Sequence, residues 1–261
     1  MFTKIYDELT ATLDDPNLVE LTNGDDVLNL TGSDVNLVNA KFGDDTISGG
    51  ENTDIIFGMN GDDVIGGGAG DDIIVGGIGA DRLFGSSGND IIVGRTDDAM
   101  IGGDNGFDIL YLAAAGDDDG FFDYVTQARG IEAIVAYGQE EVSARVSLTS
   151  IQGQSQDDGD ETTPDTDDTF IAVGLESLSL IGVHKFMEDG ALSFSVEDID
   201  GQEEQDYIEL LNLDIFSELN LDLKAITFGG EENSVTIVTD MDLDDITAFD
   251  GVSLEDMSMD A

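Results

Sequence analysis

The feature that most constrains this chain is a nine-residue unit that repeats in phase from Thr31 to Tyr111. Its clearest copy runs from Gly67 to Val75 and reads GGAGDDIIV; we number positions 1 to 9 from this copy. Position 8 is aliphatic in every unit: Val38, Ile47, Ile56, Ile65, Ile74, Leu83, Ile92, Ile101 and Leu110. An earlier copy, Leu21 to Asn29, is offset by one residue at Leu30. A fixed short period of this kind indicates stacked units that share one continuous core.

Within each unit, the residue types divide into a turn and a strand. Glycines are frequent at positions 1, 2 and 4, where they permit positive φ and close backbone approach. Position 6 is acidic in most units: Asn36, Asp45, Asp54, Asp63, Asp72, Asp81, Asp90, Ala99 and Asp108. The three residues that follow have strand character, and alternation places position 8 inward and positions 7 and 9 outward.

These units resemble the RTX (repeats-in-toxin) calcium-binding family, whose repeat is G-G-x-G-x-D-x-U-x with U a large aliphatic residue. The resemblance implies an all-β fold: a right-handed parallel β-roll in which two sheets enclose a thin aliphatic core, followed by a C-terminal β-rich region. Two units form one coil, so residues eighteen apart stack. The resemblance also implies that each ion lies between stacked turns, held by position 6 carboxylates and turn carbonyls.

The stacking predicts two ladders of ligands. One edge carries Asp45, Asp63 and Asp81 and breaks at Ala99, whereas the other carries Asn36 followed by Asp54, Asp72, Asp90 and Asp108. Adjacent carboxylates give five sites: Asp45/Asp63, Asp63/Asp81, Asp54/Asp72, Asp72/Asp90 and Asp90/Asp108. The pairings through Asn36 and Ala99 should be weak or empty. With the carboxylates, the glycines of position 4 complete the predicted ligand set: Gly43, Gly61, Gly70, Gly79, Gly88 and Gly106. In three units position 4 is instead Asp34, Asn52 or Asp97, and Asn52 tolerates a left-handed turn best.

The donor chemistry favours Ca²⁺. Oxygen is the only donor in quantity, and loops of carboxylates and carbonyls suit a large hard cation better than Mg²⁺, which requires tight octahedral geometry. A ladder of turn-capping aspartates without metal is the alternative. It leaves stacked carboxylates to repel one another.

Composition limits the partners. The chain has 261 residues, with 59 Asp and Glu against 8 Lys and Arg, and a formal net charge of -51. Such a field repels nucleic acid and anionic lipid and attracts divalent cations. The alternative, an acidic disordered tail, conflicts with 40% hydrophobic residues placed periodically. Cysteine is absent, and we expect neither a transmembrane segment nor an N-terminal signal peptide.

The outward positions predict unequal faces. On the sheet built from the units at Gly49, Gly67, Gly85 and Gly103, positions 7 and 9 are all apolar, from Ile55 to Tyr111. On the opposite sheet they are mixed. A broad apolar face is unusual for a soluble monomer. We therefore expect the C-terminal half to cover it, with self-association or a surface partner as the alternative.

We expect five segments along the chain: an N-terminal cap helix in 1–20, with an apolar stripe at Phe2, Ile5, Leu9 and Leu13; the calcium-binding β-roll in 21–111; continuing β-coils in 112–151; an acidic linker in 152–168; and a β-rich region in 169–261. In the last segment we expect strands at 170–180, 192–196, 207–213, 221–228 and 235–238. It resembles the C-terminal region of type I-secreted RTX proteins at Val196–Ile199, Asp206–Leu210 and Ile246–Val252. The resemblance implies an uncleaved export signal that includes 257–261, recognised by the type I secretion machinery.

Catalysis has little support. His184 is the only histidine, so neither H-E-x-x-H nor any multi-histidine zinc site can form, and no G-x-S-x-G is present. The predicted function is therefore that of an extracellular, non-catalytic calcium-binding protein that folds on binding Ca²⁺ and acts in cell-surface or matrix adhesion or assembly. A secretion and folding module, or a secreted hydrolase using carboxylate chemistry, is the alternative.

Overall fold

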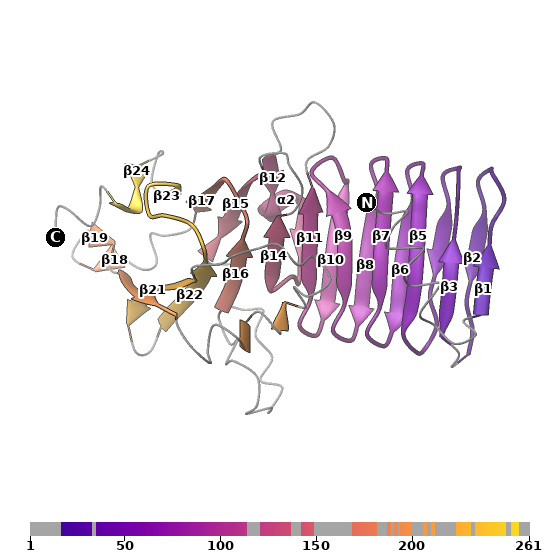
Figure 1. Ribbon diagram of the computed structural model, residues 1–261, viewed down its shortest axis with the longest axis horizontal. Coiled ribbons are helices and arrows are strands. Elements are labelled where there is room, and N and C mark those ends of the chain that lie inside the picture. The colour runs from indigo at the N-terminus through magenta and orange to yellow at the C-terminus, as the bar shows by residue number, and fades with distance from the viewer. Residues whose placement is uncertain are drawn as a thin grey trace. The chain divides into compact units, whose positions relative to one another are not determined.

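The computed structural model describes residues 17–32, 35–113, 121–136, 142–148, 169–181, 187–188, 191–192, 194–199, 206–207, 210–211, 223–230, 233–248 and 252–255 (Figure 1). The chain divides into two compact units, 1–115 with 127–131, and 116–126 with 132–261. The expected cap helix, the linker 152–168, His184 and the segment 257–261 lie outside the described residues.

The first unit is a roll of two parallel sheets. Successive strands alternate between the sheets, and each pairs with the strand one coil later, as the stacked strands from β1 to β11 show (Figure 1). One sheet contains β1 (Asn17–Glu20), β3 (Asn36–Asn39), β5 (Asp54–Asn60), β7 (Ile73–Ile78), β9 (Ile91–Arg95) and β11 (Ile109–Ala113). The other contains β2 (Val27–Asn29), β4 (Thr46–Ser48), β6 (Val64–Ala69), β8 (Arg82–Ser87), β10 (Met100–Asn105) and β13 (Ala128–Arg129). The predicted parallel β-roll is thereby confirmed.

The register follows the repeat. Ile56 pairs with Ile74, and Ile74 with Ile92, so that residues eighteen apart lie side by side. The position 8 side chains form the core and are at most 2% exposed from Val38 to Leu110. From Ile56 to Ile92, each is flanked on both sides by the position 8 residue of the neighbouring coil, and this stacking supplies the apolar burial that one unit alone cannot provide.

The roll begins earlier than expected. Asn17–Glu20, placed by the sequence with the cap helix, is strand β1 and pairs in parallel with β3. The copy at Leu21–Asn29 supplies β2, which pairs with β4. In both pairs the partners are nineteen residues apart, for example Val19 with Val38 and Leu28 with Ile47. The one-residue offset is therefore accommodated in the turns, while the strands stay in register.

The turns require positive φ at two positions of the unit. Position 4 glycines have φ from 110° at Gly70 to 145° at Gly79. Position 2 also has positive φ in most units, although not at Gly50 or Arg95, and four of the residues that adopt it there are not glycine: Lys41, Met59, Ser86 and Asp104, with φ between 76° and 88°. These four are all the non-glycine residues with positive φ among those described, so Asn52 does not use its tolerance of the left-handed region.

The second unit is also rich in strands. Parallel pairing joins β14 (Ala133–Ala136), β16 (Thr169–Val173) and β22 (Asn233–Thr239), and it joins β12 (Phe121–Asp123), β15 (Ser143–Ser147), β17 (Ser177–Ile181) and β23 (Ile246–Ala248). Antiparallel pairing joins β20 (Phe194–Asp198) and β21 (Lys224–Gly230) to β22, β18 (Met187–Glu188) to β19 (Ala191–Leu192), and β24 (Val252–Ser253) to β23. A short helix, α2 (Tyr124–Gln127), follows β12.

Two expectations for this unit differ from the structure. The strand expected over 170–180 is two strands of different sheets, β16 and β17, because the chain turns at Gly174 with a φ of 70°. The strand expected at 207–213 is wrong where the chain is described: Asp206 and Tyr207 are helical, and the Leu211 amide donates to the Tyr207 carbonyl at 2.9 Å, an i to i−4 bond.

Candidate metal centre

The position 6 aspartates form two ladders of buried carboxylates. In each ladder the backbone N–H of one aspartate donates to Oδ1 of the aspartate one coil later. The distances are 2.8 Å for Asp45 to Asp63, Asp63 to Asp81, Asp72 to Asp90 and Asp90 to Asp108, and 2.7 Å for Asp54 to Asp72. All seven side chains are at most 1% exposed. The five neighbour pairs predicted from the sequence are therefore brought together.

The ladder beginning at Asn36 continues without a gap. The backbone N–H and the side-chain Nδ2 of Asn36 both donate to Asp54 Oδ1, at 3.1 and 2.6 Å. The amide preserves the stacking but contributes no charge, and Asp54 Oδ2 accepts the Gly50 N–H at 2.7 Å. Both oxygens of Asp54 thus accept hydrogen bonds from protein donors, and the weakness of a metal site between Asn36 and Asp54 remains a prediction.

Five other ladder carboxylates each have one buried oxygen that accepts no hydrogen bond. Oδ2 of Asp45, Asp63, Asp72, Asp81 and Asp90 is buried and has no hydrogen-bond partner. A buried carboxylate oxygen without a donor is costly, because it has lost its water and gained nothing in return. Five such atoms at equivalent positions indicate a missing positive partner rather than a local defect.

The glycines of position 1 shape the space in front of these oxygens. A Cβ at Gly58 would lie 2.5 Å from Asp63 Oδ2 and 2.6 Å from the Gly76 carbonyl oxygen. A Cβ at Gly76 would lie 2.5 Å from Asp81 Oδ2, and Gly67 and Gly85 are placed in the same way beside Asp72 and Asp90. Only glycine leaves this volume free, and at Gly58 a carboxylate and a carbonyl of the next coil converge on it. Such oxygens are the ligands that Ca²⁺ takes.

Electrostatics give the same picture. Burial, the largest contribution, raises the pKa of Asp63 and Asp72 to about 7 and that of Asp81 and Asp90 to about 6, against 3.8 for a free side chain. The backbone donors oppose this rise and the neighbouring carboxylates reinforce it. Without a cation the ladders are therefore unfavourable near neutral pH, and a divalent ion between two carboxylates reverses the sign of the local field.

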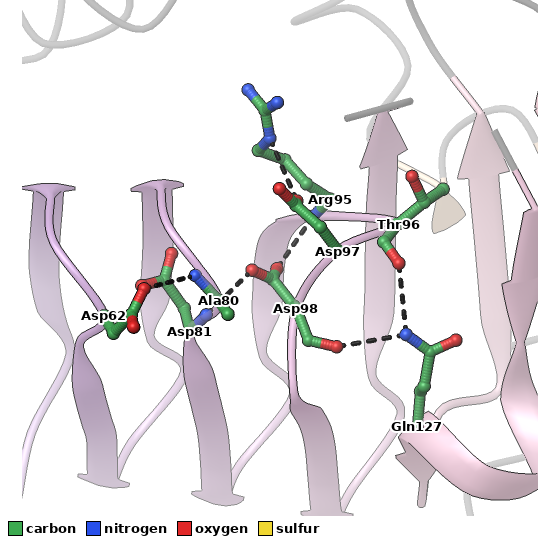
Figure 2. Close-up of polar contacts among 8 residues, drawn as sticks. All are labelled: Asp62, Ala80, Asp81, Arg95, Thr96, Asp97, Asp98 and Gln127. Atoms are coloured by element: carbon green, nitrogen blue, oxygen red, sulfur yellow. Dashed lines mark hydrogen bonds and ion pairs between the residues drawn. The ribbon is translucent and has the colours of Figure 1, made fainter. Parts of the chain in front are cut away.

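The hydrogen-bonded ladder does not stop at Asp81, because Asp98 takes the place that the repeat register assigns to Ala99, while the weakness of a metal site there remains a prediction. Asp98, one residue earlier, is 1% exposed, and its Oδ1 accepts the Asp81 N–H at 3.1 Å in place of a position 6 carboxylate (Figure 2). Its Oδ2 accepts the Arg95 N–H at 2.8 Å. Burial raises the pKa of Asp98 to about 8. Gln127 Nε2 fixes this turn by donating to the carbonyls of Thr96 and Asp98, each at 3.1 Å (Figure 2).

The shorter turn explains the shift. From Asp81 to Asp98 the spacing is 17 residues instead of 18, so the ladder continues although the sequence register fails. Both Asp98 oxygens have backbone donors, as in Asp54. Asp98 therefore ends the ladder as a hydrogen-bond acceptor, and its signal in the sequence was the acidic pair Asp97-Asp98 beside the expected position.

A second, exposed ladder runs through position 5 in the opposite sense. Here the later coil donates to the earlier one: Asp62 N–H to Asp44 Oδ1 at 2.9 Å, Ala80 N–H to Asp62 Oδ1 at 2.8 Å, and Asn89 N–H to Asp71 Oδ1 at 2.7 Å. The contact between Asp62 and Ala80 is visible in Figure 2. Sequence reasoning missed these side chains. Position 5 is acidic or amide in most units, which was the available signal.

The glycines of position 4 stack directly on one another. A Cβ at Gly61, Gly79, Gly88 or Gly106 would overlap the backbone of the position 4 glycine one coil earlier, and one at Gly43 that of Gly24. Their predicted role as carbonyl ligands remains a prediction. Within the described residues, no group of three or more His, Cys, Asp or Glu side chains surrounds one point. Backbone carbonyls such as that of Gly76, beside Asp63 Oδ2, are further oxygen donors that the turns offer.

Together these features define a class: a parallel β-roll whose turns stack carboxylates in pairs and leave oxygen-lined space between coils for hard cations. Comparison with known families gives the particular kind. The family model described as "RTX calcium-binding nonapeptide repeat (4 copies)" matches residues 30–65 and again 66–101. The stretch from 30 to 101 thus consists of RTX calcium-binding repeats, and such repeats bind calcium. Neither the curated proteins nor the solved structures gave a match.

Where the chain is described, no helix is both long and apolar enough to cross a membrane. RTX repeat proteins are typically secreted.

Proposed function

We propose that this chain is a secreted, non-catalytic protein that orders when it meets extracellular calcium and then acts in adhesion or assembly outside the cell. The observation that carries the proposal is the set of five buried Oδ2 atoms without donors, on Asp45, Asp63, Asp72, Asp81 and Asp90. At pH 8, where these carboxylates are ionised, a cation is the chemical complement that supports this proposal. About five Ca²⁺ ions follow, one between each of the five stacked carboxylate pairs.

Calcium acts as a folding switch in this proposal. In a low-calcium cytosol the ladders hold desolvated charges that repel one another, and a single aliphatic row per sheet does not offset them. Sites of the extracellular type have Kd values of about 10⁻⁴ to 10⁻³ M, so at ~1 mM calcium each contributes roughly 0.4–1.4 kcal/mol. Five sites contribute roughly 2–7 kcal/mol, which is comparable with the stability of a whole domain.

Circular dichroism tests the switch. The full chain in chelator is expected to lack most of its β signal, and calcium added to the millimolar range should restore it cooperatively; magnesium is the matched control and should restore little. Bound calcium counted on the same sample should approach five per chain. A complete β spectrum in chelator would refute the switch.

The role in adhesion or assembly rests on the absence of catalytic motifs and on the sheet edges that β1 and β2 form among the described strands. The first strands of the two sheets, β1 and β2, are edge strands, with Leu18 and Val27 50% and 76% exposed. Unpaired edges are suited to pairing with another chain. Sedimentation of the full chain with and without calcium, beside hydrolysis assays on polysaccharides and peptides, distinguishes this role from the alternative of a secreted hydrolase. Export by the type I machinery remains part of the proposal, on the C-terminal resemblance.

A further inference from the structure

The ladder aspartates fall into two groups according to what their Oδ2 atom meets. In five of them, Oδ2 is buried and has no hydrogen-bond partner: Asp45, Asp63, Asp72, Asp81 and Asp90. In three others, Oδ2 accepts the backbone N–H of position 2 in the same turn: Thr22 donates to Asp26 at 2.8 Å, Gly50 to Asp54 at 2.7 Å and, as Figure 2 shows, Arg95 to Asp98 at 2.8 Å. The first kind of turn is called open here, and the second kind closed.

The backbone conformation at position 2 divides these turns in the same way. In the five open turns, the position 2 residue has a φ between 76° and 113°: Lys41, Met59, Gly68, Gly77 and Ser86. In the three closed turns, Thr22, Gly50 and Arg95 do not have positive φ. None of these turns departs from the division, so the φ of position 2 and the state of Oδ2 change together.

Turning over one peptide unit accounts for both differences. The N–H of position 2 and the carbonyl of position 1 point in opposite directions from one planar unit, and turning this unit over changes φ at position 2. In a closed turn the N–H faces the carboxylate. In an open turn it faces away, and the position 1 carbonyl is reversed with it. The carbonyl oxygen of Gly76, in an open turn, would lie 2.6 Å from a Cβ at Gly58, in the space beside Asp63 Oδ2.

Open and closed turns therefore differ in what they offer a cation. The open turn leaves its own Oδ2 available and directs a carbonyl oxygen toward the coil before it, and both atoms are ligands that Ca²⁺ accepts. The closed turn directs the positive end of an N–H dipole to the place where the ion would bind. That hydrogen bond stabilises the buried carboxylate oxygen without a metal. A closed turn thus has the donor arrangement expected of a metal-free site.

Gly50 is in the closed turn in which this change is easiest. Glycine adopts positive φ about as readily as negative φ, whereas a residue with a Cβ does not. The rest of the Asp54 site is formed: the Asp54 N–H donates to Asp72 Oδ1 at 2.7 Å, and a Cβ at Gly49 would meet Asp54 Oδ2, at 2.9 Å, and the Gly67 carbonyl oxygen of the next coil. The Gly50 N–H occupies the oxygen that an ion needs.

The other two closed turns lack this freedom. Thr22 has a Cβ, and its hydroxyl donates to Asp26 Oδ2 at 2.7 Å in addition to its N–H. Arg95 also has a Cβ, and its turn is the one that is a residue short. These two turns lie at the two ends of the same ladder.

We propose that Gly50 is the hinge of a peptide flip that admits calcium to the Asp54/Asp72 site, whereas the turns of Asp26 and Asp98 stay closed. The other four pairs need no such change, because the carboxylate that begins each of them lies in an open turn. The Asp54/Asp72 site therefore fills last, since its apparent affinity is reduced by the fraction of turns that have flipped. This proposal rests on the calcium sites proposed above, and it adds to them a positioning residue and an order of filling.

Nuclear magnetic resonance on the full chain with isotope-labelled glycine tests the flip. The Gly50 amide is identified as the signal that is lost in Gly50→Ala. A hydrogen bond to a carboxylate deshields an amide proton, so this signal should lie downfield when the roll first orders in calcium. At higher calcium it should move upfield in a separate, later step. The Arg95 amide, followed in an arginine-labelled chain, is the internal control, because it donates to Asp98 Oδ2 at 2.8 Å and should not move in that step.

Calcium counting at a series of free calcium concentrations gives a second readout. Gly50→Ala is compatible with the closed turn, where a Cβ would lie 3.1 Å from the Gly32 carbonyl oxygen and 3.5 Å from Asp54 Oδ2. The methyl group disfavours the flipped form, so the last site should weaken roughly five- to thirty-fold while the other sites keep their affinity. Gly66→Ala is the matched control, because its added Cβ meets open space, and it should leave the whole isotherm unchanged.

The outcomes separate the flip from calcium binding itself. If the parent chain binds calcium while the Gly50 amide keeps its position up to saturation, the flip is wrong and calcium binding stands. The same holds if Gly50→Ala and the parent chain give identical isotherms, or if the Arg95 amide moves together with that of Gly50. A parent chain that binds no calcium at millimolar concentration would overturn the proposed function and the flip with it.

Discussion

Replacing Asp63 by asparagine should change the stability of the roll in opposite directions with and without calcium. Asp63 Oδ1 accepts the Asp45 N–H at 2.8 Å, and its Oδ2 is buried without a partner. Asparagine has the same size and keeps the acceptor. It removes the buried charge, and with it the ligand that the proposed Asp45/Asp63 and Asp63/Asp81 sites would share.

The two effects can be given magnitudes. Burial raises the pKa of Asp63 from 3.8 to about 7, so at pH 8 the folded roll carries the full cost of ionising this group. A shift of about three units corresponds to about 4 kcal/mol, which screening by solvent at the roll's edge reduces to about 1–2 kcal/mol. With ~1 mM calcium, losing two sites removes roughly 1–3 kcal/mol.

The assay is circular dichroism at pH 8. In chelator, sucrose is added to bring the folding equilibrium into range, and Asp63→Asn should then be more ordered than the parent chain. In millimolar calcium the same variant should unfold at a lower urea concentration. Asp62→Asn is the control: it removes the same charge from the same turn, but the side chain is exposed and its Oδ1 bonds only the Ala80 N–H. A shift in one direction under both conditions would contradict the assignment of Asp63 as a shared ligand.

Three further outcomes follow from the same geometry. Gly79→Ala should lower the stability in calcium by more than about 2 kcal/mol, because φ is 145° and the new Cβ would overlap the Gly61 backbone, whereas Gly66→Ala, with open space around it, should change the urea midpoint little. Asp98→Ala should destabilise the roll by about 1–3 kcal/mol, because it leaves the buried Asp81 N–H without an acceptor, whereas Ala99→Asp should have no comparable effect. Equal urea midpoints for the two variants would contradict the assignment of Asp98 as the acceptor. In chelator the roll should be more ordered at pH 5 than at pH 8. The pKa values of the buried aspartates in the folded state, about 6 to 7, exceed 3.8, so at pH 5 the folded state binds protons that the unfolded state has released. Calcium titrations should correspondingly show weaker binding at pH 5, and a dichroism spectrum in chelator that does not change with pH would contradict this reasoning.

The features of the fold and site that were predicted correctly are those that depend only on the nine-residue repeat length. Nine-residue spacing placed Ile56, Ile74 and Ile92 in one inward row, and it paired Asp63 with Asp81 across one coil. Both results need only the repeat length and the alternation of a strand. They hold for as long as every coil has the same number of residues.

What escaped prediction lies where local geometry departs from the period. The turn before Asp98 is one residue short, so the buried acceptor is Asp98 and not Ala99. The space beside Asp63 Oδ2 depends on Gly58, a position 1 glycine that alternation alone does not connect with a carboxylate five residues later. The burial of Phe57 could not be read from its apolar character, because the same character fits an exposed interface.

Most repeat units carry a ladder carboxylate and a core side chain only two residues apart, and this spacing couples ion binding to core packing. Position 6 provides the carboxylate and position 8 the core side chain, and both stack on the same neighbouring coils, as Asp72 on Asp90 and Ile74 on Ile92. In the proposed arrangement, an ion between two coils would fix the distance at which their core residues meet, and core contact would in turn present the next carboxylate pair. A defect in the middle of a ladder, such as at Asp63, interrupts two ion sites and the register on both sides. Asp45 is the first acceptor of its ladder, where it accepts the Asp26 N–H, and a defect there interrupts one ion site. Loss of calcium affinity should therefore be larger for Asp63→Asn than for Asp45→Asn, and equal losses measured by calcium titration would mean that Asp63 is not shared between two ion sites.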